Sequence, residues 1–143
     1  MPKKLRYFLF ACALLSLSGG VIAQSNLIGT LLTSAARTTT TDSADVNNTS
    51  TRGAHIVINV TAYTSGLWTP IVQGKDPISG NYYTILTGPT INGTGTTVIK
   101  VYPALTAAAN SVANDFLPRT WRVRMSGGAT PSATFSVGYL ADY

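Results

Sequence analysis

WTPIVQGKDPISGNYYTILTGPTINGTGTTVIKVY, residues 68–102, is the stretch that decides the fold. An apolar strand pattern is followed by a loop rich in Gly, Asp-Pro and Ser-Gly, and residues 81–87 form a second strand pattern with aromatic and β-branched side chains. Gly-Pro and Asn-Gly turns then lead into a third strand pattern over residues 96–102. Turn residues between short strand patterns are typical of hairpins. The stretch predicts an antiparallel meander and no catalytic cleft.

Four further segments carry strand patterns, namely residues 27–36, 54–63, 120–126 and 133–141. Residues 37–53 and 103–115 predict polar loops, because neither has a strong apolar period. Pro70 predicts an edge position or a bulge for its strand. Within 54–63, one face is predicted to hold Ile56, Ile58, Val60 and Ala62. Seven short strands in one domain, residues 24–143, predict an all-β fold: an antiparallel β-sandwich, jelly-roll-like or immunoglobulin-like.

The composition argues against partners that are recognised by charge. Charged residues make up 10% of the chain, and there is no Glu. From Gln24 onward, seven Lys and Arg residues oppose five Asp, which leaves a net charge of +2. This field is too weak to favour nucleic acid or an anionic membrane surface. A neutral polar surface of this kind is common in proteins that pack into assemblies.

Residues 1–23 resemble a secretory signal peptide. Lys3, Lys4 and Arg6 precede an apolar run over residues 7–17, and small residues lead to a plausible cleavage site after Ala23. If this segment is not cleaved, it could anchor the chain in a membrane. The only cysteine, Cys12, lies inside the segment, so the mature chain is expected to contain no disulfide.

The chain offers few groups for catalysis. His55 is the only histidine, and metal or Ser-His-Asp chemistry would need convergent partners for it. Each Asp has a local explanation in a turn, a loop or the C-terminus, and no pair is placed together as a glycosidase requires. We expect a protein that is not an enzyme and has no cofactor or metal.

The candidate interaction surface comes from residues on two strands and a loop. Arg122 and Arg124 alternate with the inward-facing Trp121, so they predict a surface stripe for an acidic partner or for carboxylates of a neighbouring subunit. Lys75 and Tyr82 flank the loop of the first hairpin.

An aromatic sugar-binding platform is the alternative use of this surface. It would be built from Trp68 and whichever of Tyr82 and Tyr83 is exposed, since these neighbours point to opposite faces. The pattern itself favours a role for these rings in the core and at an interface.

The string QGKDPISGNYYTIL, residues 73–86, resembles small proteins encoded in tailed-bacteriophage genomes. The likeness extends through Gly95–Val98, Val101–Pro103, Leu105–Asn110 and Leu117–Val123, and a start at Ser34–Thr38 followed by Ser43–Asp45 also fits. It implies a β-sandwich found among virion structural proteins, such as capsid decoration or head-tail components. It transfers no functional residues.

Together these observations predict a structural protein that packs against other virion subunits or against itself as a homo-oligomer. The alternative is an exported adhesion or carbohydrate-binding module that contacts glycans. Virion proteins assemble in the cytoplasm, so a working leader would favour the secreted alternative. An over-extended gene start would leave the virion interpretation intact.

Overall fold

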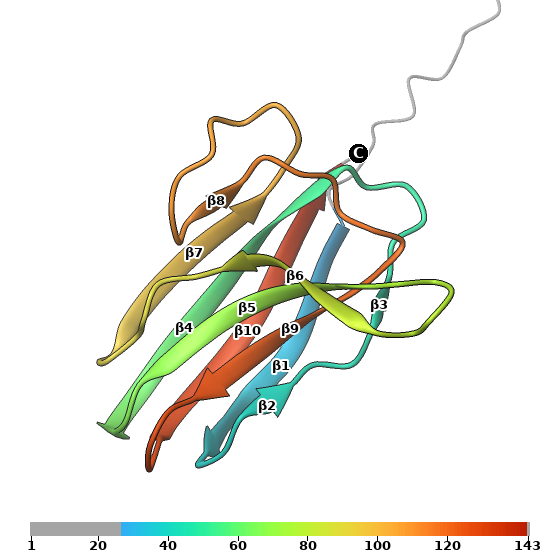
Figure 1. Ribbon diagram of the computed structural model, residues 1–143. Helices are drawn as coiled ribbons and strands as arrows, with labels where there is room; N and C mark the ends of the chain where they lie inside the picture. Colours follow the sequence, from blue (N-terminus) through green and yellow to red (C-terminus); the bar gives the residue numbers. More distant parts are fainter. Residues whose placement is uncertain (1–26, 143) are drawn as a thin grey trace, which may run out of the picture.

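The structure is a computed structural model that describes residues 27–142, and within this range the fold is an all-β sandwich. The predicted leader, residues 1–23, lies outside the described residues. Two sheets pack face to face as separate layers (Figure 1). Among residues 27–142 no helix is long and apolar enough to cross a membrane.

Each sheet combines long strands with short pairing segments. The first sheet has the order β1-β10-β4-β7-β8, and the second has the order β2-β9-β5-β6 with β3 also paired to β9. The strand bounds are β1 Leu27–Arg37, β2 Thr41–Asp42, β3 Val46–Asn47, β4 Gly53–Ser65, β5 Trp68–Lys75, β6 Tyr82–Thr87, β7 Gly95–Val101, β8 Val112–Ala113, β9 Thr120–Gly127 and β10 Ser132–Asp142.

The seven longer strands match the seven predicted ones in order and approximate bounds. The three short strands β2, β3 and β8 lie in segments that were predicted as loops. Each is only two residues long and pairs with a strand far away in sequence or across a loop, so no local pattern could mark it.

The predicted meander over residues 68–102 is correct for its first two strands and wrong for the third. β5 and β6 form an antiparallel hairpin in the second sheet, whereas β7 crosses to the first sheet and pairs with β4. The crossing buries Ile99 and Val101 beside Ile56 and Ala54. Hydrophobic alternation identifies the buried face of a strand but not the sheet to which the strand belongs.

Pro70 does not make β5 an edge strand, because β5 lies between β9 and β6. The β5–β6 pairs begin at Ile71, the residue after Pro70, so the missing N–H falls outside the paired positions. The register of this pair shifts further along β5, between Val72 and Gln73. The Pro70 carbonyl still accepts a hydrogen bond from Gly88 N at 2.7 Å.

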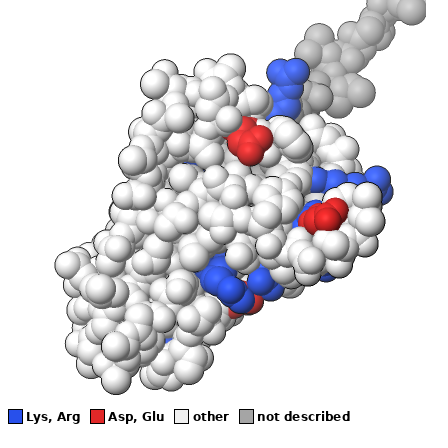
Figure 2. Space-filling model, viewed as in Figure 1, with Lys and Arg blue, Asp and Glu red and all other residues white. Residues whose placement is uncertain are grey.

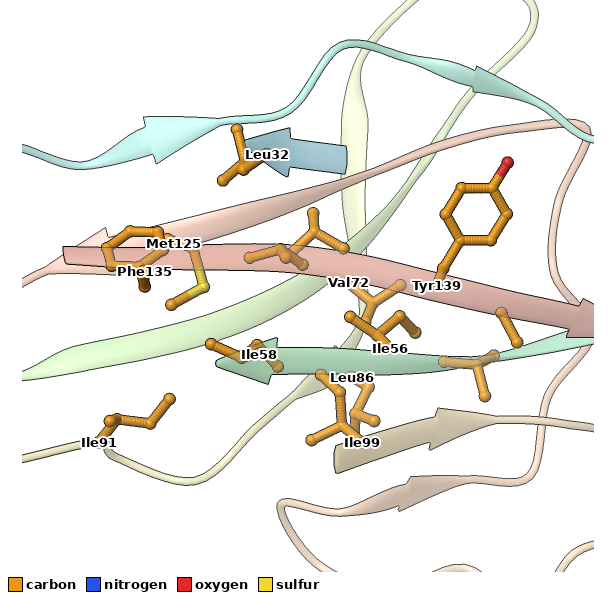
Figure 3. Close-up of a cluster of buried hydrophobic side chains, with 14 of the residues drawn as sticks. Leu32, Ile56, Ile58, Val72, Leu86, Ile91, Ile99, Met125, Phe135 and Tyr139 are labelled. Carbon is orange, nitrogen blue, oxygen red and sulfur yellow. The ribbon is translucent and has the colours of Figure 1, made fainter. Parts of the chain in front are cut away.

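The core lies between the two sheets and is filled by alternate residues of both. Side chains from β4, β5, β9 and β10 point toward one another in this layer (Figure 3). Trp68 meets Phe135 edge to face at 4.9 Å, and Trp121 meets Tyr139 in the same way at 5.3 Å. Ala62 is exposed, contrary to the prediction, because the β4–β10 register shifts between Phe135 and Thr134.

The polar segment 37–53 is fixed to the sandwich by side-chain hydrogen bonds. The Asn48 carboxamide donates to the carbonyls of Leu117 and Thr51 at 2.8 Å each. Its oxygen accepts from the backbone N–H and the hydroxyl of Thr51 at 2.8 and 2.7 Å. A single asparagine therefore joins this segment to the chain that leads into β9.

Candidate functional site

The predicted interaction residues gather on the outer face of the second sheet. Alternation along β9 sends Trp121, Val123 and Met125 into the core and Arg122 and Arg124 outward, as the sequence predicts. Around these arginines lies a group that we call the charged network. Its members are Asp42, Asp45, Gln73, Lys75, Tyr82, Arg122 and Arg124.

Asp42 is held between the two arginines. Arg124 binds both carboxylate oxygens, Nε to Oδ1 at 2.7 Å and Nη2 to Oδ2 at 2.9 Å, and Arg122 Nη1 lies 3.0 Å from Oδ2. Such two-point pairing fixes geometry as well as charge. The hydrogen bonds from Arg124, followed by the charge of Arg122, hold the pKa of Asp42 below its ordinary value.

Tyr82 forms the second half of the network. The Arg122 guanidinium lies 3.5 Å above the centroid of the Tyr82 ring, while Arg122 Nε donates to Gln73 Oε1 at 2.9 Å. The Tyr82 hydroxyl donates to Asp45 Oδ1 at 2.6 Å, and Lys75 Nζ contacts Asp45 Oδ2 at 2.9 Å. These hydrogen bonds, the one from Tyr82 first, lower the pKa of Asp45.

The network is closed within one chain. Four of the five predicted interaction residues, Lys75, Tyr82, Arg122 and Arg124, are brought together, but their charges meet Asp42 and Asp45 of the same molecule. Sequence reasoning missed these two aspartates as partners because they lie in a segment without period and pair with residues 30 to 82 positions away. The arrangement ties residues 41–47 to the sheet.

Trp68 does not belong to this surface, and its prediction as an interaction residue is wrong for the described fold. Its exposed fraction is 0%, and its ring packs on Phe135 in the core. The indole N–H has no hydrogen-bond partner among the described residues. Trp68, Pro70 and Val72 are buried together on one face of β5, and this alternation was the sequence signal for burial.

The convergence of Asp42 and Asp45 on one network does not create a general acid and base. Such a pair needs one carboxyl whose pKa is raised so that it keeps a proton. Here hydrogen bonds lower the pKa of both groups, so both are ionised at neutral pH. His55 lies exposed on the first sheet, and among residues 27–142 no group of three or more His, Cys, Asp or Glu could hold a metal ion.

A shallow hollow of about 270 Å³ lies beside the β5–β6 loop. Tyr83 and Phe116, which are 47% and 64% exposed, line it together with Pro118 and Arg119. Tyr83 lies over Gly74, where a Cβ would come within 2.5 Å of the tyrosine ring. Within residues 27–142 the Arg119 guanidinium forms no ion pair, so this hollow combines exposed rings with an available cation.

Comparison with known proteins finds no family model and no curated protein that matches the chain. The likeness to tailed-phage proteins is therefore not supported by a family match, and the function must be inferred from the surfaces of the sandwich.

Proposed function

We propose that the chain is a non-enzymatic structural protein that packs into a multi-subunit assembly, and on the sequence resemblance we take that assembly to be a tailed-phage virion. The observation that carries the proposal is the distribution of charge. The cations of the charged network meet carboxylates of the same chain, and the first sheet presents a nearly uncharged edge and outer face.

The edge strand β1 illustrates this neutrality. Arg37 is its only charged residue, and its guanidinium donates to the carbonyls of Thr33, Ala35 and Phe135 at 2.7 to 3.1 Å. Natural edge strands are usually protected by charges that discourage pairing with another chain. The register of β1 shifts twice, between Thr30 and Leu32 and between Leu32 and Ala35, but residues 27–30 pair regularly and carry no charge. This regular part of the edge supports contact with a neighbour.

The molecule also has charge on a restricted part of its surface. In the view of Figure 2, Lys, Arg and Asp side chains lie on the side of β6 and β9 and at the upper end of the molecule, whereas the surface over β7 and β8 is almost entirely uncharged. Contact through the neutral parts would depend on buried area rather than on ion pairs.

Sedimentation of native-source lysates through a density gradient tests the proposal. The chain should co-sediment with large particles and remain bound after a wash in molar salt, because salt screens exposed charges but not buried apolar contact. A chain found only in the soluble fractions at low salt would contradict the proposal. If the salt wash alone releases the chain from the particles, contact through uncharged surface would be contradicted.

The hollow beside Tyr83 supports a second candidate, an exported carbohydrate-binding module. Exposed aromatic rings beside an available arginine suit a sugar that carries a carboxylate. Tyr83→Ala should then abolish binding in a glycan array. Tyr82→Phe changes a side chain on the opposite face of β6 and should leave the binding unchanged. An unmodified chain that binds no glycan would eliminate this candidate.

A further inference from the structure

The outer face of the first sheet is ordered into rows by the strand register. One row runs through Ile28, Leu140, His55 and Lys100, and the next through Thr30, Gly138, Val57 and Val98. All of these residues point away from the core, because their neighbours along each strand are the inward-facing ones.

Large apolar side chains are exposed in both of these rows. Ile28 is 72% exposed, Val98 42% and Leu140 40%. Ile28 pairs directly with Leu140 in one row, and Val98 pairs with the half-buried Val57 in the next. Leu140 and Val57 are diagonal neighbours on β10 and β4, so the four residues form an oblique patch across β1, β10, β4 and β7. Exposed apolar residues that are contiguous in this way are characteristic of interaction sites.

Most residues around this patch are small and polar, and the charged ones lie at one end. Gly138 lies within it, and the rows toward the other end hold Ser136, Asn59 and Thr96. Two charged residues of this face lie at the end opposite Ser136: Lys100 at the end of its row beside the short strand β8, and Asp142 two residues beyond Leu140 on β10. A face on which one cation and one anion cancel cannot select a strongly acidic or basic partner, but it can pack against an identical face without net repulsion.

The size of the face suits such a contact. Four strands spaced about 4.8 Å apart, with about nine residues each that rise by about 3.3 Å, cover a flat area of roughly 500–600 Å². Protruding side chains make the accessible surface larger than this flat area. Stable interfaces bury about 800 Å² on each partner, and faces of stacked sheets pack about 10 Å apart. A twofold axis would place the apolar patch on its own copy.

We propose that the outer face of the first sheet is a homotypic interface, on which a second copy of this chain packs through Ile28, Val57, Val98 and Leu140. The inference rests on the proposed function and names its partner: the contact within the assembly is between copies of this chain.

Sedimentation velocity of the chain, as its native source produces it, tests this inference from micromolar to hundreds of micromolar concentration. The unmodified chain should pass from monomer to dimer mass as concentration rises. Val98→Lys and Leu140→Lys should each raise the dissociation constant of the dimer at least tenfold, because each would bury an unpaired charge. Thr87→Lys is the matched control: it adds the same charge to an exposed strand position of the second sheet and should leave the constant unchanged.

Three results would overturn the inference. The first is a monomer mass at every concentration, the second an equal effect of Val98→Lys and Thr87→Lys, and the third a dimer that both patch variants leave intact. Far-ultraviolet circular dichroism with a thermal melt identifies a variant that fails to fold, and the other patch variant then decides. A monomeric chain that still co-sediments with particles would overturn the homotypic contact and leave the proposed function standing. A dimer absent from particles would overturn the proposed function and leave the homotypic contact standing.

Discussion

The guanidinium of Arg122 stacks on the ring of Tyr82 at 3.5 Å, and the hydroxyl of that same tyrosine binds Asp45 at 2.6 Å. Tyr82 thereby links β9 to the segment that contains β2 and β3, which also pairs with β9 through its backbone. The charged network is in this sense a structural tie between a polar segment and the sandwich.

Removing the Tyr82 side chain should therefore cost stability in two separable parts. Tyr82→Phe keeps the stacked ring and loses the hydrogen bond to Asp45, so it should lower the free energy of unfolding by less than about 1 kcal/mol at this exposed site. Tyr82→Ala also loses the cation–π contact and should lower it by about 1–2 kcal/mol. Urea denaturation measures both, and equal losses in the two variants would mean that the stacking contributes nothing.

The carboxylate of Asp42 should make stability depend on pH in the acid range. Its pKa is lowered in the folded chain by Arg124 and Arg122, so its contribution is fully present above the unfolded-state pKa of about 3.9 and is lost as pH falls through the folded value. Asp42→Asn should be less stable at neutral pH by about 1–2 kcal/mol, and the difference from the unmodified chain should shrink below about pH 4. Urea melts at a series of pH values measure this. A difference that is constant with pH would show that the ionised carboxylate is not responsible.

Gly74 should not tolerate a side chain while Tyr83 lies over it. A Cβ at this position would approach the Tyr83 ring to 2.5 Å and Pro118 Cγ to 2.9 Å. Gly74→Ala should cost about 1–3 kcal/mol of unfolding free energy by overpacking. In Tyr83→Ala the same change should cost less, because the ring is gone, and a double-mutant cycle measures the coupling. Additive losses would contradict the close packing of these two residues.

Trp68 should behave as a core residue in every assay. Trp68→Ala should lower the free energy of unfolding by about 3–5 kcal/mol, as expected for a large side chain removed from a packed core. Loss of ligand or particle binding in that variant would report on folding and not on a surface contact. Thermal melts measure the loss, and a change below about 0.5 kcal/mol, the scale of a surface substitution, would contradict the burial.

The strands were predictable because their alternation is local. On β9 the order of Trp121, Arg122, Val123 and Arg124 is enough to assign both faces, since successive side chains must point in opposite directions. The same rule applied to Trp68 and Val72 on β5 would have placed Trp68 in the core. The aromatic chemistry of Trp68 suits a sugar platform, but its position on the strand places it in the core.

The candidate site was only half predictable, because its pairings are not local. Arg122 and Arg124 could be placed on the surface from their own strand, but their neutralisation by Asp42 depends on a pairing across 80 and 82 residues between β2 and β9. The place of β7 in the first sheet was unpredictable for the same reason, because its pairing with β4 is not local. It creates the Val57–Val98 contact on which the neutral face depends, and no short window of sequence contains both residues.

The central claim, that this chain is a structural subunit of an assembly, is tested most directly by quantitative mass spectrometry of particles purified from the native source, with the culture medium examined in parallel. The account predicts the chain in particles at a fixed ratio to the most abundant particle protein. A chain that begins at Gln24, is found in the medium and is absent from particles would contradict it and would favour the exported binding module.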